Sequence, residues 1–445
     1  MNFLELKIEK LIYGGDGLAR LPGDAEGRGK AVFVPFVLEG ECVDATLIAE
    51  KPGFARAALN RVVEPSPHRT QALCPYFTRC GGCHYQHSTY EHQLEIKTSI
   101  FRENLRRIAR LELDAELQIH PSPPWNYRNR TRLRVKRNPQ FVFGYNRFGS
   151  HELEPVEECP ISSALINRAI TTVWNLGRDG GIDAAICEIE FFSNADDSQL
   201  LLEIYVESGT TPEQARNWCE NLRGGIPSVV GVTAFAVSQP RTASQPENKI
   251  LASTGATALE YSTAEYKYRV SAGSFFQTNR HLTDELVKIV TSGQSGGTAL
   301  DLYGGGGLFA AVLCRQFERV IAVESSPQSF ADLEYNLPGN GKAIGTSIEN
   351  YLARRGGKGG ADLIVLDPPR GGLGRKVTAE LVKLRVPRLT YVSCDPATLA
   401  RDLAPLLAAG YRVEQAHLVD LFPQTFHIES VLHLARDRQR SATRI

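Results

Sequence analysis

One cysteine stands at the end of a strand-like run, two residues before a proline. The run 389–393 is rich in β-branched and aromatic residues, as buried strands are, and Asp395 and Pro396 end it before a helix predicted over 397–408. Cys394 is therefore expected at the carboxyl edge of a sheet, where open α/β sheets bind ligands. A thiolate there can attack a substrate, and a nearby cation or helix N-terminus increases its thiolate fraction. Cys394 is thus a candidate nucleophile, the alternative being an inert buried thiol.

The elements that would position a cofactor beside this cysteine follow the order of a nucleotide-binding domain. A strand predicted over 298–303 opens into the glycine turn 304–307 and then a helix, which lets backbone approach a nucleotide closely. Glu324 ends a second predicted strand, where its carboxylate can accept hydrogen bonds from ribose hydroxyls. Asp367 ends a third, before two prolines. This order favours an S-adenosylmethionine-dependent methyltransferase over a dinucleotide enzyme.

Four other cysteines have the spacing of metal ligands. Cys74, Cys80 and Cys83 lie within ten residues, with two glycines between the last two, and Cys159 is followed by a proline. Together they supply the four thiolates that an iron–sulfur cluster or a zinc site requires. The spacing alone does not choose between iron and zinc.

A basic stretch follows the three clustered cysteines. Residues 117–151 contain seven Lys or Arg and no acid. The period of two of a strand would place five of these cations on one face: Arg128, Arg130, Arg132, Arg134 and Lys136. Because like charges on one face repel each other, the pattern predicts a phosphate-binding face for RNA, the alternative being a solvated strand face.

Composition limits the remaining possibilities. The chain has 445 residues with 50 Lys and Arg against 50 Asp and Glu, so any surface for nucleic acid must be local. There is no apolar run of membrane-spanning length and no signal-peptide pattern, which predicts a cytoplasmic protein with no membrane partner.

The patterns divide the chain into three parts. Residues 1–65 alternate as a small OB-like β-barrel, 66–265 form a central α+β domain that holds the cysteines, and 266–445 form an α/β Rossmann-like methyltransferase domain. The helix predicted over 90–110 is a candidate for packing on this last domain. The polar stretch 238–248 is expected as a loop.

Motifs along nearly the whole chain resemble those of the bacterial RNA uracil-5-methyltransferase family with a TRAM domain. They read GGDGLARL, CPYFTRCGGCHYQH, FFQTN, DLYGGGGLF, VIAVESS, LDPPR, YVSCDPATLARD and FPQTFHIESV. The resemblance implies an RNA-binding TRAM barrel, a [4Fe-4S] cluster on the four cysteines and a monomeric enzyme. It also implies 23S ribosomal RNA as the substrate, in preference to transfer RNA.

The resemblance assigns roles residue by residue. It makes Cys394 the nucleophile and Glu429 the general base. To the cofactor or uracil pocket it assigns Gln277, Tyr303, Gly304, Gly306, Glu324 and Asp367.

Two positions depart from the family's pattern. The family often has cysteine at Gly304, a change expected to be harmless in a turn. It usually has asparagine at Asp395, whose carboxylate would raise the pKa of the Cys394 thiol if the side chain pointed inward.

The implied chemistry requires these groups. A thiolate that adds to carbon 6 of uracil makes carbon 5 nucleophilic enough to accept a methyl group, and a donor such as Gln277 stabilises the enolate. Glu429 then removes the carbon 5 proton. Such a uracil must be looped out or flipped. The alternatives are the same chemistry on transfer RNA, a non-catalytic RNA-binding iron–sulfur protein, and an amino-group methyltransferase, which Arg370 disfavours because an aromatic residue usually stands there.

Overall fold

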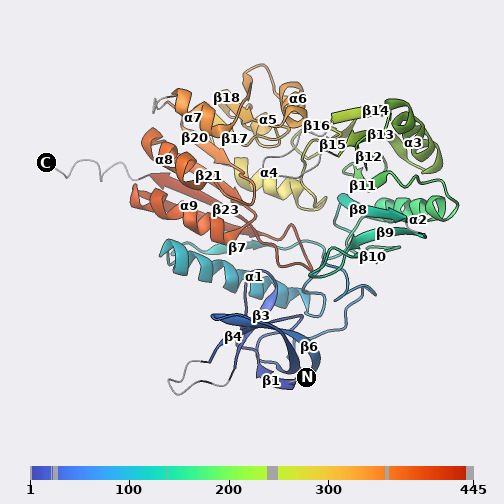
Figure 1. The fold of residues 1–445 in the computed structure, drawn as a ribbon. Helices are drawn as coiled ribbons and strands as arrows, with labels where there is room; N and C mark the ends of the chain where they lie inside the picture. Colours follow the sequence, from blue (N-terminus) through green and yellow to red (C-terminus); the bar gives the residue numbers. More distant parts are fainter. Residues whose placement is uncertain are drawn as a thin grey trace.

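The computed structural model describes residues 3–21, 23, 29–137, 139–237, 249–355 and 360–436. The polar stretch 238–248, expected as a loop, lies outside these ranges. Three sheets organise the chain: an N-terminal sheet, a central sheet and a C-terminal sheet, seen in Figure 1 at the bottom, the right and the left. Within the described ranges, no helix is both long and apolar enough to cross a membrane.

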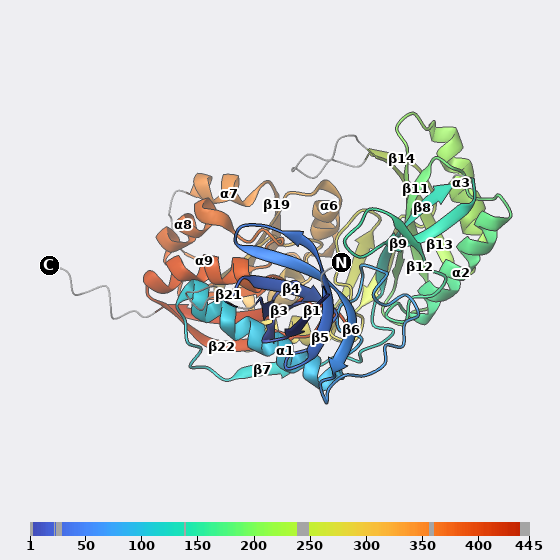
Figure 2. The ribbon, with the colours of Figure 1, turned by 60° about the horizontal axis from the view of Figure 1, so that its bottom comes forward.

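The N-terminal sheet has six strands in the order β1-β5-β6-β4-β3-β2, and it curls around its own apolar core (Figure 2). Its strands are β1 (Phe3–Lys7), β2 (Lys10–Leu11), β3 (Asp16–Arg20), β4 (Ala31–Pro35), β5 (Cys42–Glu50) and β6 (Phe54–Glu64). Alternate residues face inward, as in β4, where Val32 and Val34 are buried. This alternation is the one that predicted a barrel.

The central sheet has seven strands in the order β10-β9-β8-β11-β12-β13-β14. They are β8 (Arg130–Arg137), β9 (Phe141–Asn146), β10 (Leu153–Pro155), β11 (Ile186–Ser193), β12 (Leu200–Val206), β13 (Val229–Ala236) and β14 (Lys249–Gly255). Helices α2 (Ala164–Arg178) and α3 (Pro212–Gly225) pack on it, and the side chains of Ser163 and Thr211 cap their N-termini.

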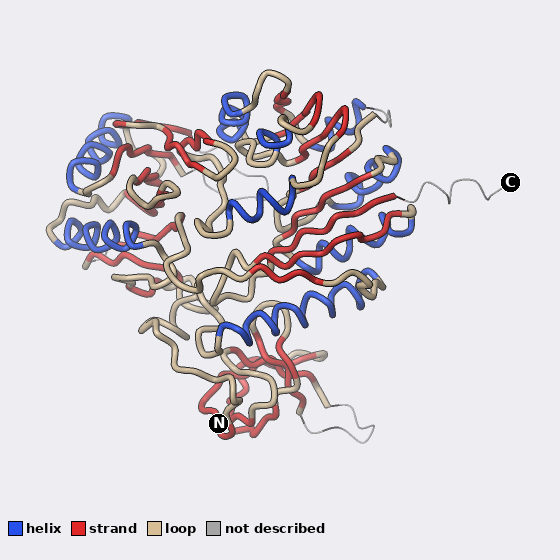
Figure 3. Tube along the Cα trace, turned by 180° about the vertical axis from the view of Figure 1, so that it is seen from behind, coloured by secondary structure: helices blue, strands red, loops and turns tan. Residues whose placement is uncertain are grey.

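The C-terminal sheet has eight strands in the order β19-β18-β17-β20-β21-β23-β22-β7 (Figure 3). They are β7 (Leu117–His120), β17 (Gly296–Leu302), β18 (Phe317–Glu324), β19 (Gly341–Gly345), β20 (Leu363–Leu366), β21 (Arg388–Ser393), β22 (Tyr411–Val419) and β23 (Glu429–Arg436). The first five in spatial order are parallel, and β23 runs antiparallel to β21. The helices of this part are α4 (Thr283–Thr291), α5 (Ala310–Leu313), α6 (Pro327–Asn336), α7 (Ile348–Arg355), α8 (Gly374–Leu384) and α9 (Pro396–Ala408).

Two elements from the middle of the chain join the C-terminal sheet. Strand β7, which the sequence analysis placed in the central domain 66–265, instead pairs in parallel with β22. Helix α1 (Tyr90–Asn104) and the π-helical turn 105–109 after it pack on α9, where the helix predicted over 90–110 was a candidate to lie. The pairing joins segments about 300 residues apart, so local patterns could not reveal it.

A hairpin leads into the C-terminal part. Strands β15 (Ala258–Ser262) and β16 (Lys267–Ser271) form it, and β16 lies against α6. The segment 272–282 then passes between the central and C-terminal sheets before α4 begins. It carries Gln277, which is buried.

Candidate active site and four-cysteine cavity

The predicted cofactor residues and the candidate nucleophile meet at one edge of the C-terminal sheet. Tyr303 follows β17, Glu324 ends β18, Asp367 follows β20 and Cys394 follows β21. Because these four strands are parallel neighbours, their carboxyl ends lie side by side. The crevice outside such ends is where open α/β sheets bind ligands.

Glu429 begins β23, the strand adjacent to β21, and lies opposite Cys394. In the antiparallel register of β21 and β23, Ser393 pairs with Ser430, which places the next residue of one strand opposite the preceding residue of the other. Burial raises the pKa of the Cys394 thiol to about 12, and the nearby Glu429 and Asp367 carboxylates contribute to the increase. Burial, followed by Asp367, also raises the pKa of Glu429 well above its usual value. Burial therefore opposes ionisation of both groups.

Arg370 opposes these shifts. Its positive charge lowers the pKa of both Cys394 and Glu429, in partial compensation for burial. Its Nη2 lies 3.3 Å from Nε2 of His427, whose pKa falls to about 3, first because of burial and then because of this arginine. The imidazole is therefore neutral. From the sequence, Arg370 served only to disfavour an amino-group methyltransferase, because its effect on Cys394 and Glu429 depends on the fold.

The side chain of Asp395 is engaged in capping a helix. It is the N-cap of α9, and its Oδ1 accepts hydrogen bonds from the backbone nitrogens of Ala397 at 3.0 Å and Thr398 at 2.8 Å. It still raises the pKa of the Cys394 thiol, but less than burial or Glu429 does. The departure from the family's asparagine therefore preserves helix capping.

Three residues in and beside the glycine turn have positive φ angles, which allow the backbone to turn tightly. Tyr303 has a φ of 69°, which is unusual for an aromatic residue, and Gly305 and Gly307 have φ of 52° and 91°. Glu324 supports the turn, since its Oε2 accepts a hydrogen bond from the nitrogen of Gly305 at 3.0 Å. Strained backbone of this kind concentrates at ligand sites.

The other two predicted glycines leave room beside the turn. A Cβ at Gly304 would lie 3.4 Å from the Cβ of Ala322, and one at Gly306 would lie 3.6 Å from the Cβ of Asp332, both ordinary contacts. The expectation that a side chain at position 304 is tolerated agrees with these distances.

Asp301 belongs to this edge and was missed from the sequence. It is fully buried in β17, and neither carboxyl oxygen has a hydrogen-bond partner within the described part of the chain. Burial, followed by the Asp367 charge, raises its pKa to about 7. Asp301 lies one residue inside the end of β17, whereas the acids predicted from the sequence stand at strand ends.

The four predicted ligand cysteines line one cavity of about 90 Å³. Cys74, Cys80 and Cys83 come from the segment after the barrel, and Cys159 comes from the loop before α2. Burial raises the pKa of Cys80 to about 12, and the neighbouring thiols Cys159 and Cys74 raise it further. Binding of a metal cation would favour the thiolate form of these buried cysteines, and their protons would be released on binding.

A second cluster of potential ligands lies outside this cavity. One atom each of His68, His92 and Glu95 lies within 4.8 Å of the others. The two imidazoles, however, stack with centroids 4.1 Å apart and planes 10° from parallel, so a metal could not lie in both ring planes. The contact is therefore a ring stack.

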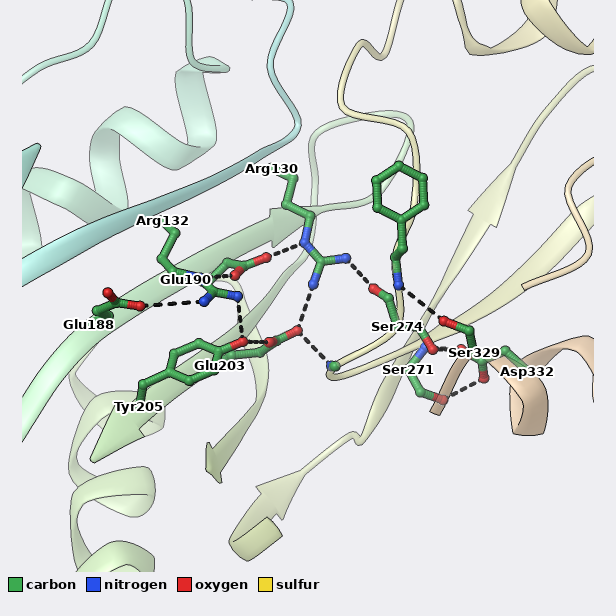
Figure 4. Close-up of polar contacts among 12 residues, drawn as sticks. Arg130, Arg132, Glu188, Glu190, Glu203, Tyr205, Ser271, Ser274, Ser329 and Asp332 are labelled. Carbon is green, nitrogen blue, oxygen red and sulfur yellow. Dashed lines mark hydrogen bonds and ion pairs between the residues drawn. The ribbon is translucent and has the colours of Figure 1, made fainter. Parts of the chain in front are cut away.

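The predicted phosphate-binding face is wrong for Arg130 and Arg132. Figure 4 shows their guanidinium groups turned toward carboxylates of the neighbouring strands. Arg130 pairs with Glu190 on β11 and, at 2.8 Å, with Glu203 on β12. Arg132 pairs with Glu190 and donates to the Tyr205 hydroxyl at 2.6 Å. The chain's own acids thus neutralise these cations, and they lie 58 to 73 residues away in sequence.

The remaining members of the basic stretch differ from one another. Arg128 precedes β8 and lines the cysteine cavity. Arg134 is exposed and donates to Oδ1 of Asn146 at 2.8 Å, and Lys136 is exposed at the end of the face. Arg132 is also exposed despite its ion pairs, so Arg132, Arg134 and Lys136 are the cations of this face that reach the surface.

The same ion-pair network reaches the loop before Gln277. Arg130 donates to the carbonyl oxygen of Ser274, and Glu203 accepts from the nitrogen of Gly273 at 2.8 Å (Figure 4). On the other side of the loop, the hydroxyl of Ser274 donates to Asp332 of α6 at 2.6 Å. The network therefore holds this loop between the central sheet and α6.

Comparisons with known proteins agree with this architecture. The family described as tRNA (Uracil-5-)-methyltransferase matches residues 89–346 and 360–437, and the TRAM domain matches residues 3–59. An uncharacterized RNA methyltransferase of Aquifex aeolicus is 32% identical over 437 residues, covering 96% of this chain and 97% of its own. One of Caldanaerobacter subterraneus is 30% identical over 453 residues, covering 97% and 98%.

A solved structure shares the fold over its whole length. It is the tRNA (uracil-54, C5)-methyltransferase of Pyrococcus abyssi in complex with S-adenosyl-L-homocysteine. The TM-score is 0.74 at 22% identity, with 97% of this chain and 100% of that chain covered.

Proposed function

Because the chain belongs to the tRNA (uracil-5-)-methyltransferase family, we propose that it methylates carbon 5 of a uridine in RNA through a covalent bond to Cys394. The observation that carries this proposal is the pairing of β21 with β23, which sets Glu429 opposite Cys394 at the sheet edge where β17 opens into the glycine turn. A nucleophile and a base at paired positions of adjacent strands project to the same side of the sheet, where both can reach one ring.

Each group has one task in the proposed reaction. The Cys394 sulfur bonds to carbon 6 of uracil, and the electron pair moves to the 4-carbonyl, where Gln277 can donate a hydrogen bond. S-adenosylmethionine supplies the methyl group that carbon 5 receives. Glu429 accepts the carbon 5 proton, the double bond re-forms and the carbon–sulfur bond breaks. Arg370 favours the thiolate that begins this sequence.

The residues at the strand ends fit the methyl donor. Glu324 can accept hydrogen bonds from ribose hydroxyls, and the backbone of Gly304 and Gly306 allows close approach of the nucleoside. Tyr303 and Asp367 flank the same edge. The S-adenosyl-L-homocysteine bound in the Pyrococcus abyssi structure supports this use of the site.

The four-cysteine cavity is proposed to hold a [4Fe-4S] cluster. Among the described residues, no three of these sulfurs lie within 4.8 Å of one another. A tetrahedral zinc site, with zinc–sulfur bonds of about 2.3 Å, requires sulfurs about 3.8 Å apart. A cluster in which each cysteine binds a different iron suits the wider spacing. Metal analysis of protein purified without air tests it: iron and sulfide are expected, and stoichiometric zinc without iron contradicts it.

The proposed substrate is 23S ribosomal RNA, bound by a monomer. The TRAM domain together with the four cysteines supports this RNA, by the resemblance to that type of enzyme. Transfer RNA is the second candidate, because the Pyrococcus abyssi relative in fold is named for a uracil of tRNA.

Parallel assays separate the two substrates. Purified protein would be incubated with labelled S-adenosylmethionine and either undermethylated 23S RNA or undermethylated transfer RNA, and 5-methyluridine would be mapped by mass spectrometry. We expect the label in one uridine of 23S RNA. Label only in transfer RNA would contradict the substrate, and label in neither, or at another atom, would contradict the reaction.

A further inference from the structure

Arg128 presents a half-buried cation, without a carboxylate partner among the described residues, to the four-cysteine cavity. Its side chain lines the cavity together with Cys83 and Cys159, and its Nε is buried without a hydrogen-bond partner. Among the residues that the structure describes, no carboxylate forms an ion pair with Arg128, in contrast to Arg130 and Arg132 two and four residues later. Its close polar neighbours are the hydroxyls of Tyr127 and Tyr145.

An unpaired charge in such a place is costly. Removing one partner of a buried ion pair is strongly destabilising, because the charge that remains has lost both water and a counter-ion. A guanidinium cannot escape this cost by losing its proton, since its pKa is above about 12. An anion inside the cavity would remove the penalty, and four cysteines that have become metal-bound thiolates are such an anion.

Hydrogen bonds between main-chain atoms hold the backbone of Arg128 in place. The nitrogen of Arg128 donates to the carbonyl oxygen of Ile161 at 2.9 Å, and its carbonyl accepts from the nitrogen of Ser163 at 2.8 Å. These bonds tie it to the segment that carries Cys159. The nitrogen of Asn129 donates in turn to the carbonyl oxygen of Thr278 at 3.2 Å, next to Gln277. The backbone of Arg128 and Asn129 therefore connects the segment of Cys159 with the segment of Gln277, while the Arg128 side chain lines the cysteine cavity.

We propose that Arg128 is the counter-cation of the four-thiolate site, donating N–H groups to cysteine or inorganic sulfur and stabilising the bound cluster. This inference rests on the proposed [4Fe-4S] cofactor. A nearby cation and hydrogen bonds to sulfur stabilise the more negative, reduced cluster, so they raise its reduction potential. They also oppose loss of the cluster from the protein.

The test compares full-length proteins purified without air. Arg128→Gln keeps a donor without the charge, Arg128→Lys keeps the charge without the planar fork, and Arg134→Gln is the control because Arg134 is exposed on the neighbouring strand. Iron and sulfide content, the midpoint potential from a titration followed by electron paramagnetic resonance, and the rate of bleaching in air would be measured. Circular dichroism would monitor folding.

The expected pattern is specific to charge. Arg128→Gln should shift the midpoint potential to a more negative value and speed bleaching several-fold, Arg128→Lys should lie close to wild type in potential, and Arg134→Gln should match wild type in both. A folded Arg128→Gln chain that holds no cluster, with Arg128→Lys loaded, would also support the role. Unchanged potential and bleaching in Arg128→Gln, or equal loss of the cluster in both Arg128 variants, would overturn it. Wild-type protein that contains no iron would contradict the proposed [4Fe-4S] cofactor. This result differs from every result that overturns the role of Arg128 alone.

Discussion

The phenolic hydroxyl of Tyr13 donates a hydrogen bond to the main-chain carbonyl oxygen of Cys394 at a distance of 3.3 Å. These residues are 381 positions apart in sequence. The ring of Tyr13 also meets Phe426 edge-on, with centroids 5.4 Å apart. The N-terminal barrel, which Figure 2 shows in front of the C-terminal sheet, therefore contacts the loop that carries the nucleophile. The barrel thus contacts the main chain of the candidate nucleophile directly.

Loss of this hydroxyl should slow methyl transfer. A hydrogen bond of this kind contributes about 0.5–1.5 kcal/mol, so Tyr13→Phe should lower kcat by roughly 2- to 10-fold through less precise placement of Cys394. Methyl transfer under saturating RNA measures it. Tyr335→Phe, at an exposed position of α6, is the control and should match wild type. An unchanged kcat in Tyr13→Phe would show that the contact does not position the nucleophile.

The charges around Cys394 predict opposite effects of two substitutions on its alkylation. The pKa of the thiol is raised to about 12, so the rate of reaction with iodoacetamide should climb with pH between about 7 and 10. Glu429→Gln removes a charge that raises this pKa, which increases the thiolate fraction and the rate. Arg370→Gln removes a charge that lowers it, which decreases the rate.

Mass spectrometry of the peptide that contains Cys394 separates its alkylation from that of the other cysteines. At pH 8 we expect a several-fold increase in the glutamate variant and a several-fold decrease in the arginine variant. Changes in the same direction would contradict the electrostatic account of the site.

Two glycines of the cofactor turn should respond differently to a methyl group. Gly307 has a φ of 91°, and an added Cβ would lie 3.1 Å from Cδ1 of Leu333, so Gly307→Ala should weaken S-adenosylmethionine binding by about 1–2 kcal/mol or more. Gly304→Ala meets only ordinary contacts and should bind nearly as wild type. Calorimetric titration with the cofactor or with S-adenosylhomocysteine provides the comparison. Equal losses in both variants would contradict this assignment of strain.

The buried arginine network should matter for stability more than for RNA binding. Arg130→Ala leaves the buried carboxylates of Glu190 and Glu203 without their partner, which costs roughly 3–5 kcal/mol of unfolding free energy. The expected result is a clear fall in Tm with an unchanged salt dependence of RNA affinity. Arg134→Ala, on the exposed part of the same strand, should leave Tm unchanged. A flatter salt dependence in Arg130→Ala would restore the phosphate-contact interpretation.

Local patterns predicted the elements that end at the active site. The apolar run before Cys394 forms β21, and the strand predicted over 298–303 forms β17 with ends that differ by one or two residues. The cysteine spacing predicted ligands that do line one cavity. These features depend on neighbours along the chain, which a sequence displays directly.

Features that depend on distant strands could not be predicted in this way. The alternation of Arg130 and Arg132 is present in β8, but the acids that neutralise them come from β11 and β12. Likewise β7 joins the C-terminal sheet only through β22. The cationic role of Arg370 depends on the folding of β20, β21 and β23 against one another.

The division of labour between Cys394 and Glu429 is tested most directly by trapping the covalent adduct. In the Glu429→Gln variant, Cys394 can still add to carbon 6 of uracil, and carbon 5 can still receive the methyl group. The carbon 5 proton, however, cannot be removed efficiently, so the protein–RNA adduct should accumulate. Cys394→Ala should form none, although RNA and cofactor can still bind. On a denaturing gel with labelled RNA, the account predicts a shifted band for Glu429→Gln that requires S-adenosylmethionine and is absent in Cys394→Ala. A shifted band that persists in Cys394→Ala would contradict the account, because another residue would then be the nucleophile.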